Sequence, residues 1–219
     1  MSRMPNPWPL VIAPIVVSLL AASSSVQPAR EQAVAPEVLA KIWDSGHVSS
    51  PLPPLVDHAE VVRRLEALTP AAPGLFTLEK IGESIEGRSI NYVRAGTGPM
   101  GVLLWSQMHG DEPTATSALF DVFDYFQKHR DDPVVSRILT RLTLHVVPML
   151  NPDGAERFQR RNAQSIDINR DALRLQTPEG RALKGLRDRL NPRVGFNLHN
   201  QGWRKIGRAS CRERVWIPV

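Results

Sequence analysis

Two residues with metal-binding side chains, His109 and Glu112, lie three positions apart in the stretch LLWSQMHGDEPTATSALFDVF, which runs from Leu103 to Phe123. An apolar run ends just before them, and a helical pattern begins just after them. A third candidate, His199, follows another apolar run much later in the chain. Catalytic zinc sites use three ligands of these types and leave one position open. The sequence therefore indicates one metal site made of His109, Glu112 and His199.

Each of these residues also has an ordinary structural role open to it. A carboxylate such as Glu112 is favourably placed near the N-terminus of a helix. His199 would serve equally well as a core histidine that donates to a carbonyl oxygen. The choice depends on which other polar side chains the fold brings to the same place.

The elements around these residues alternate between strands and helices. Apolar and alternating runs predict strands at 74–82, 89–96, 101–107, 142–150 and 193–200, and helical spacing predicts helices at 58–68, 113–129 and 177–190. This order predicts an α/β fold with a mixed, largely parallel central sheet flanked by helices. Ligands bind such sheets at the carboxyl ends of strands. His109, Asn151 and His199 each follow a predicted strand, so we expect them at one edge of the sheet.

The beginning of the chain has a composition of its own. Arg3 precedes the apolar stretch WPLVIAPIVVSLLAA and the small residues SSSVQPA. This pattern is typical of a secretory signal peptide, here assigned to residues 1–25. An uncleaved membrane anchor is the alternative, and the prolines and the short apolar length disfavour it. Residues 26–57 are interpreted as a linker or N-terminal extension. We expect a secreted or periplasmic protein with no stable membrane insertion after signal cleavage.

Charge and cysteine content exclude other classes of protein. The chain has 219 residues and a net charge of +5, and much of that positive charge lies in residues 205–219. We therefore expect no nucleic-acid partner. The single cysteine, Cys211, lies in the same tail, which disfavours disulfides and cysteine-based metal sites.

Further polar motifs follow the other predicted strands. The segments IGESIEGRSI, MHGDE, NPDG, RRN, DINRD and NLHN occur in this order between about Ile81 and Gln201. Together they resemble the zinc metallocarboxypeptidase family of carboxypeptidase A-like peptidases, in a bacterial-type form. The resemblance implies an exported hydrolase with one Zn²⁺ ion that cleaves C-terminal peptide bonds by metal-activated water. The implied substrate is a peptide or a peptidoglycan stem.

The resemblance also implies a role for each matching residue in the metal site. His109, Glu112 and His199 match the zinc ligands. Asp167 matches a carboxylate that orients the first of these histidines, a partner that metal-bound histidines usually need.

Other matching residues are implied to contact the substrate. Asn169 and Arg170 match the pair that holds the substrate's terminal carboxylate, which suits the planar fork of arginine. Arg160 matches the catalytic arginine that stabilises the oxyanion, and Arg161 remains an alternative for that role. A solvated or salt-bridged surface is the alternative for all three arginines. The NPDG segment is interpreted as a tight turn that shapes the site, and Asp153 is not expected to be catalytic.

The end of the chain departs from the family. The family's general-base glutamate lies well after the third metal ligand. In this chain the only glutamate after His199 is Glu213, and the residues around it do not match the family. Residues 206–215, IGRASCRERV, resemble one reading frame of a DNA-sequencing adapter. We therefore interpret 205–219 as a non-native tail and 58–204 as a partial zinc carboxypeptidase domain. This N-terminal fragment, truncated at its C-terminus, is expected to be inactive.

Two residues in the motifs differ from those of pancreatic members of the family, so the peptide specificity of those members does not carry over to this chain. Asp111 stands where pancreatic members of the family have an arginine, and Asp171 stands where they have an asparagine.

Two other functions remain open. One is a zinc-dependent acyl-amino-acid hydrolase of the aspartoacylase or succinylglutamate desuccinylase type, and the other is a catalytically inactive zinc-binding module.

Overall fold

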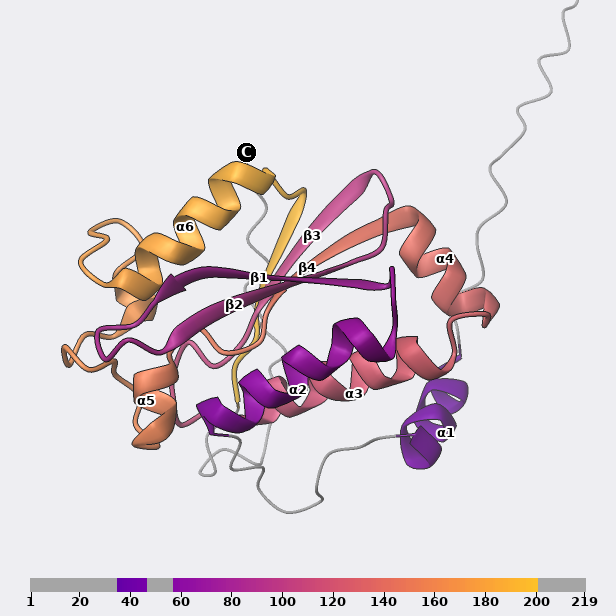
Figure 1. Ribbon diagram of the computed structural model, residues 1–219, viewed down its shortest axis with the longest axis horizontal. Helices are drawn as coiled ribbons and strands as arrows, with labels where there is room; N and C mark the ends of the chain where they lie inside the picture. The colour runs from indigo at the N-terminus through magenta and orange to yellow at the C-terminus, as the bar shows by residue number, and fades with distance from the viewer. Residues whose placement is uncertain (1–34, 47–56, 201–219) are drawn as a thin grey trace, which may run out of the picture.

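The computed structural model describes residues 35–46 and 57–200 (Figure 1). The predicted signal peptide at 1–25 and the predicted non-native tail at 205–219 lie outside the described residues. One helix, α1 (Pro36–Gly46), lies within the segment interpreted as a linker or extension.

The described chain from residue 57 onward forms alternating helices and strands around one five-stranded sheet. The elements are α2 (His58–Ala71), β1 (Phe76–Glu83), β2 (Ser89–Ala95), β3 (Met100–Trp105), α3 (Thr114–Lys128), α4 (Pro133–Arg141), β4 (Leu142–Val147), α5 (Pro152–Glu156), the 3₁₀ turn η1 (Ile168–Arg170), α6 (Pro178–Leu190) and β5 (Val194–Asn197). The strand order is β1-β2-β4-β3-β5. β2 is antiparallel to both β1 and β4, whereas β3 is parallel to both β4 and β5. The predicted mixed α/β fold is confirmed.

Helices cover both faces of the sheet. In Figure 1, α2 and α3 lie side by side under one face, and α6 lies over the other. Leu65 of α2 and Phe123 of α3 pack with Val93 and Val146 of the sheet in one buried cluster. Leu186 of α6 belongs to a second cluster on the opposite face. Two apolar layers therefore hold the sheet rigid between the helices.

Side-chain caps explain where several helices begin. Asp57 accepts a hydrogen bond from the backbone N–H of Glu60 at the start of α2, and Thr177 accepts one from Gly180 at the start of α6. Asp132 caps α4, which the sequence analysis did not predict. Pro113 differs slightly from expectation, because it is the cap residue of α3 and the helix begins at Thr114.

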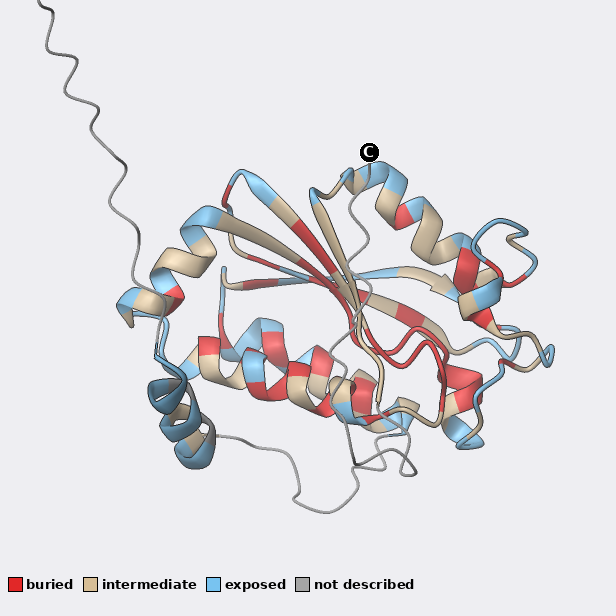
Figure 2. Ribbon diagram, turned by 180° about the vertical axis from the view of Figure 1, so that it is seen from behind, coloured by how far each residue is buried: buried red, intermediate tan, exposed pale blue. Residues whose placement is uncertain are grey.

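Buried residues gather in the sheet and in the loops that follow β3 and β4 (Figure 2). Residues 106–110 and 145–154 are buried without interruption. Polar side chains in these loops must therefore find partners inside the protein. None of the helices in the described part of the chain is long and apolar enough to cross a membrane.

One buried carboxylate, Glu179 in the first turn of α6, lacks a full set of partners. Its side chain is 0% exposed. Oε2 accepts a hydrogen bond from Asn162 Nδ2 at 3.0 Å, but Oε1 has no partner among the described residues. Burial raises the pKa of Glu179, and hydrogen bonds from its own backbone N–H and from Asn162 offset only part of that effect. The fold therefore favours the protonated acid.

This raised pKa predicts how the stability of the chain changes with pH. The folded state favours neutral Glu179, so its contribution is complete below the unfolded pKa, about 4.3. It is lost as pH rises through the higher folded pKa, by up to about 1.4 kcal/mol per pH unit. Glu179→Gln should flatten this part of the profile, measured as the free energy of unfolding in urea at several pH values. The control is the same change at exposed Glu66. Identical profiles for Glu179→Gln and the parent chain would contradict the prediction.

Candidate metal centre

Parallel strands β3 and β5 bring the two predicted metal-binding segments together. Trp105 at the end of β3 pairs with Asn197 at the end of β5. His109 follows the first strand and His199 follows the second. Because parallel strands end at the same edge of a sheet, both histidines lie at the edge where the sequence predicted a site.

The loop between β3 and α3 is fixed by tight packing. Gln107, which is 1% exposed, has a left-handed φ of 48°. Its side chain donates to the carbonyl oxygen of Gly110 and accepts from Thr116. A Cβ at Gly110 would lie 2.0 Å from the backbone carbon of Gly154, so only glycine permits this approach. The segment that carries His109 and Glu112 thus rests directly against the NPDG segment.

Glu112 bridges the two histidines. Its Oε1 lies 2.9 Å from Nδ1 of His109, and its Oε2 lies 2.7 Å from Nδ1 of His199. The imidazole rings are 4.8 Å apart between centroids. One donor atom from each residue lies within 4.8 Å of the other two. The fold therefore gathers all three predicted ligands around one point.

His109 has a further carboxylate on its other ring nitrogen. Nε2 lies 3.2 Å from Oδ1 of Asp167, whose Oδ2 accepts hydrogen bonds from Nε and Nη2 of Arg160. Nη1 of Arg160 lies 3.2 Å from Nδ1 of His109. Since His109 is only 2% exposed, Asp167 fixes the ring orientation, which is how a second carboxylate supports a histidine ligand.

The electrostatics keep both carboxylates ionised. Burial by itself would raise the pKa of Glu112, but hydrogen bonds and charge from His109 and His199 outweigh it and lower the pKa to about 2. Burial likewise opposes ionisation of Asp167, and the guanidinium of Arg160 followed by His109 lowers its pKa overall. Glu112 is thus available as an anionic ligand at any ordinary pH.

The donor set fits zinc. Two imidazole nitrogens and one carboxylate oxygen are ligands that zinc binds in a tetrahedral arrangement, and three protein ligands leave one position open. Among the described residues, this is the only group of three or more His, Cys, Asp or Glu side chains with converging donor atoms. The metal-ligand roles of these residues stay predictions.

The predicted substrate-binding residues are held near this centre in different ways. Oδ1 of Asn169 accepts a weak hydrogen bond from Nδ2 of Asn197 at 3.4 Å, which ties it to the end of β5. Arg170 is exposed, and its Nη1 donates to the carbonyl oxygen of Asn169 at 3.2 Å. Arg161 donates from Nη1 to the carbonyl oxygen of Ser165. Of the two neighbouring arginines, the fold brings Arg160 to the metal ligands.

The NPDG segment contributes more to the fold than the sequence predicted. It forms the short helix α5, not an isolated turn, and Asn151 caps it by accepting from Gly154. The fully buried Asp153 accepts from Ser84 Oγ and Arg88 Nη1, each at 2.7 Å. The sequence feature that could have indicated this contact is Arg88 in the predicted EGR turn between β1 and β2. This arginine had no assigned partner.

Several polar atoms in the segments that carry the metal ligands are buried and unpaired. They are Oδ1 of Asp111, Asn197 and Asn200, which have no hydrogen-bond partner among the described residues. Each is next to, or two positions from, a predicted ligand. Such atoms are available to a bound molecule.

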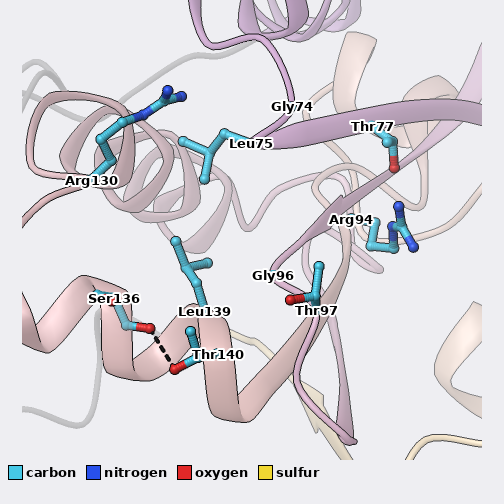
Figure 3. Close-up of a pocket in the computed structure, with 10 residues that line it drawn as sticks. All are labelled: Gly74, Leu75, Thr77, Arg94, Gly96, Thr97, Arg130, Ser136, Leu139 and Thr140. Carbon is cyan, nitrogen blue, oxygen red and sulfur yellow. Dashed lines mark hydrogen bonds between the residues drawn. The ribbon is translucent and has the colours of Figure 1, made fainter.

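A separate hollow of about 250 Å³ lies at the opposite edge of the sheet. It adjoins Gly96, which follows β2 near the beginning of β4. In Figure 3, Arg94 and Arg130 stand on opposite sides of it, with Leu75 and Leu139 between them. Because the metal ligands follow the other ends of the parallel strands, this hollow takes no part in the metal centre.

Known proteins similar to this chain include carboxypeptidases of an animal and a plant. Residues 61–204 match the family model described as zinc carboxypeptidase. Carboxypeptidase M of Mus musculus is 30% identical over 111 residues, covering 43% of this chain and 25% of the relative. Carboxypeptidase SOL1 of Arabidopsis thaliana is 33% identical over 87 residues, covering 35% and 18%. The chain thus spans a quarter or less of the length of these two relatives.

Solved structures agree on the fold. A metallo-carboxypeptidase from Burkholderia cenocepacia superposes with a TM-score of 0.60 at 23% identity, covering 65% of this chain and 40% of that one. Carboxypeptidase A from Helicoverpa armigera gives a TM-score of 0.56 at 20% identity, covering 76% and 52%. At these identities, the likeness concerns the fold alone.

Proposed function

The chain belongs to the zinc carboxypeptidase family, and from that premise we propose that it is part of an exported zinc-dependent carboxypeptidase. Its substrates are peptides or peptidoglycan stems, cleaved at the C-terminal peptide bond, in the periplasm or outside the cell. The observation that carries the proposal is the convergence of His109, Glu112 and His199 within 4.8 Å, with Arg160 hydrogen-bonded to the carboxylate behind His109.

The chain's own residues support a division of labour in this reaction. His109, Glu112 and His199 would hold the zinc ion, and Asp167 keeps His109 in its binding orientation. When bound, zinc supplies Lewis-acid polarisation of a carbonyl and lowers the pKa of water. Arg160 directs a guanidinium toward the ligands, where it would stabilise negative charge that develops on the carbonyl oxygen. Asn169 and Arg170 would hold the terminal carboxylate of the substrate.

We propose that the general base of this reaction is not one of the described carboxylates. Among the described residues, the carboxylates hydrogen-bonded to the site's histidines are Glu112 and Asp167. The first serves as a ligand and the second is paired with Arg160. Neither is free to accept a proton from water. This observation also favours a second candidate function for the chain alone, a zinc-binding module without turnover.

A hydrolysis assay on the zinc-loaded native gene product that contains residues 58–204 tests the proposal. Release of the C-terminal amino acid is measured by chromatography for an acylated dipeptide, for its C-terminal amide and for N-acetyl-aspartate. A carboxypeptidase should cleave the free acid and spare the amide. Preferential cleavage of N-acetyl-aspartate would support the acyl-amino-acid hydrolase instead. Stoichiometric zinc without cleavage of any compound would support the inactive module.

A further inference from the structure

A second hollow, of about 490 Å³, lies beside the metal centre. Three arginines, Arg161, Arg170 and Arg174, line it together with Asp167 and Asp171. Asp167 is the carboxylate that contacts Nε2 of His109. The hollow and the metal centre therefore share the carboxylate of Asp167.

Both carboxylates of this hollow are already fully engaged. Asp171 is 1% exposed and accepts hydrogen bonds from the backbone N–H groups of Gln176 and Thr177 and from Thr177 Oγ1. Asp167 is ion-paired with Arg160 and accepts from the backbone N–H of Asn169. Their oxygen atoms are thus already hydrogen-bonded within the fold, which leaves the arginines as the groups of the hollow that can bind a ligand.

The three arginines of the hollow have no such partners. Arg161 and Arg170 each donate to a backbone carbonyl oxygen, and Arg174 has no hydrogen bond or ion pair among the described residues. None of the three forms an ion pair with a described carboxylate, although all three are exposed. A guanidinium presents a planar fork that matches a carboxylate. The hollow thus contains three guanidinium groups that have no ion-pair partner among the described residues.

We propose that this hollow is a subsite for an acidic side chain of the substrate, so that the preferred peptides carry Asp or Glu near the bond that is cleaved. The inference rests on the proposed function and deepens it by naming the substrate class. Arg170 is already assigned to the terminal carboxylate, so Arg161 and Arg174 are the specificity-determining residues. A carboxylate is favoured over other anions because the hollow adjoins a centre whose substrate is a peptide.

Binding to the zinc-loaded 219-residue chain tests this subsite without requiring turnover. The probes are acetyl-Glu-Glu-Ala and acetyl-Gln-Gln-Ala, which differ only in side-chain charge, measured by isothermal titration calorimetry. The parent chain should bind the Glu peptide about tenfold more tightly, a preference that added salt weakens. Arg161→Ala and Arg174→Ala should each reduce that preference about threefold, and the double variant should abolish it.

Matched controls keep the test specific to this hollow. Arg130→Ala removes an exposed arginine at the far edge of the sheet (Figure 3) and should leave the preference unchanged. Binding of the Gln peptide and zinc content should stay constant in every variant, because Arg161 and Arg174 contact no metal ligand. Arg174→Lys should keep part of the preference, since it keeps the charge and loses the fork.

The outcomes separate this inference from the proposed function. Equal binding of both peptides by the parent chain, or a preference that survives in the double variant, would overturn the subsite and leave the carboxypeptidase proposal intact. Inorganic phosphate that displaces the Glu peptide at equal concentration would show a general anion site and overturn the substrate assignment. Failure of the chain to bind either peptide would overturn the proposed function and the subsite with it. Binding of the C-terminal amides as tightly as the free acids would do the same.

Discussion

Replacing His109 or His199 by alanine should remove zinc from the protein. Elemental analysis of the 219-residue chain should find about one zinc ion per chain in the parent and close to none in either variant, because a three-ligand site tolerates no missing ligand. His109 should be the more damaging position for folding as well. Its ring is 2% exposed, and its loss leaves a cavity beside the Asp167–Arg160 ion pair.

Two further variants make the zinc measurement decisive. Asp167→Asn keeps all three ligands and removes only the charge behind His109, so zinc affinity should fall by about tenfold without loss of the site. His129→Ala removes an exposed histidine at the end of α3 and should bind zinc as the parent does. Retention of zinc by a folded His109→Ala or His199→Ala chain would refute this metal centre, and folding is checked by circular dichroism.

The sequence predicted the parts of this centre that depend on local pattern. The strand before His109 and the strand before His199 are short apolar runs, and parallel strands must end at a common edge. That rule places two histidines from distant segments at the same edge, and the pairing of β3 with β5 brings them side by side. The spacing of Glu112 after His109 then needs only the bend between a strand and a helix. The mixed sheet followed from the same alternation of elements.

The features that the sequence did not predict are either too short for a clear pattern or depend on contacts between distant segments. Helix α4 is only nine residues long, so its apolar periodicity is not distinctive. The sequence feature that could have indicated it is the pair of the cap residue Asp132 and Pro133 at the first helical position. The contact of Gly110 with Gly154 joins the loop after β3 to helix α5 through backbone atoms, which leave no side-chain pattern. The hollow formed by Arg161 and Arg174 was likewise invisible, because a charged loop is usually a solvated surface.

Asp153 shows most clearly how a buried contact changes the interpretation of a motif. The residue was assigned to a turn, but its carboxylate joins the NPDG segment to the EGR turn between β1 and β2. Oδ1 accepts from Ser84 and Arg88, and Oδ2 accepts from the backbone N–H of Glu86 at 3.1 Å. The side chain of Asp153 is 0% exposed, whereas that of Arg88 is 29% exposed.

We expect Asp153→Ala to destabilise the domain by about 3 kcal/mol, because truncating one partner of a buried charged pair leaves the other groups unpaired. The value is at the low end for such pairs, since Arg88 reaches solvent and keeps its ion pair with Glu86. Urea denaturation of the 219-residue chain measures the change. Asp131→Ala, at an exposed position, should change stability by less than about 0.5 kcal/mol.

The same variant should weaken zinc binding, although Asp153 contacts no metal ligand. Gly154 follows Asp153 and packs against Gly110 in the loop of His109 and Glu112, so a loosened α5 allows that loop to move. A double-mutant cycle with Arg88→Gln separates the ion pair from the remaining hydrogen bonds. An additive cycle would show that the Asp153–Arg88 pair contributes nothing of its own. A coupling energy of about 1 kcal/mol or more would show that this ion pair stabilises α5, against which the loop of His109 and Glu112 packs.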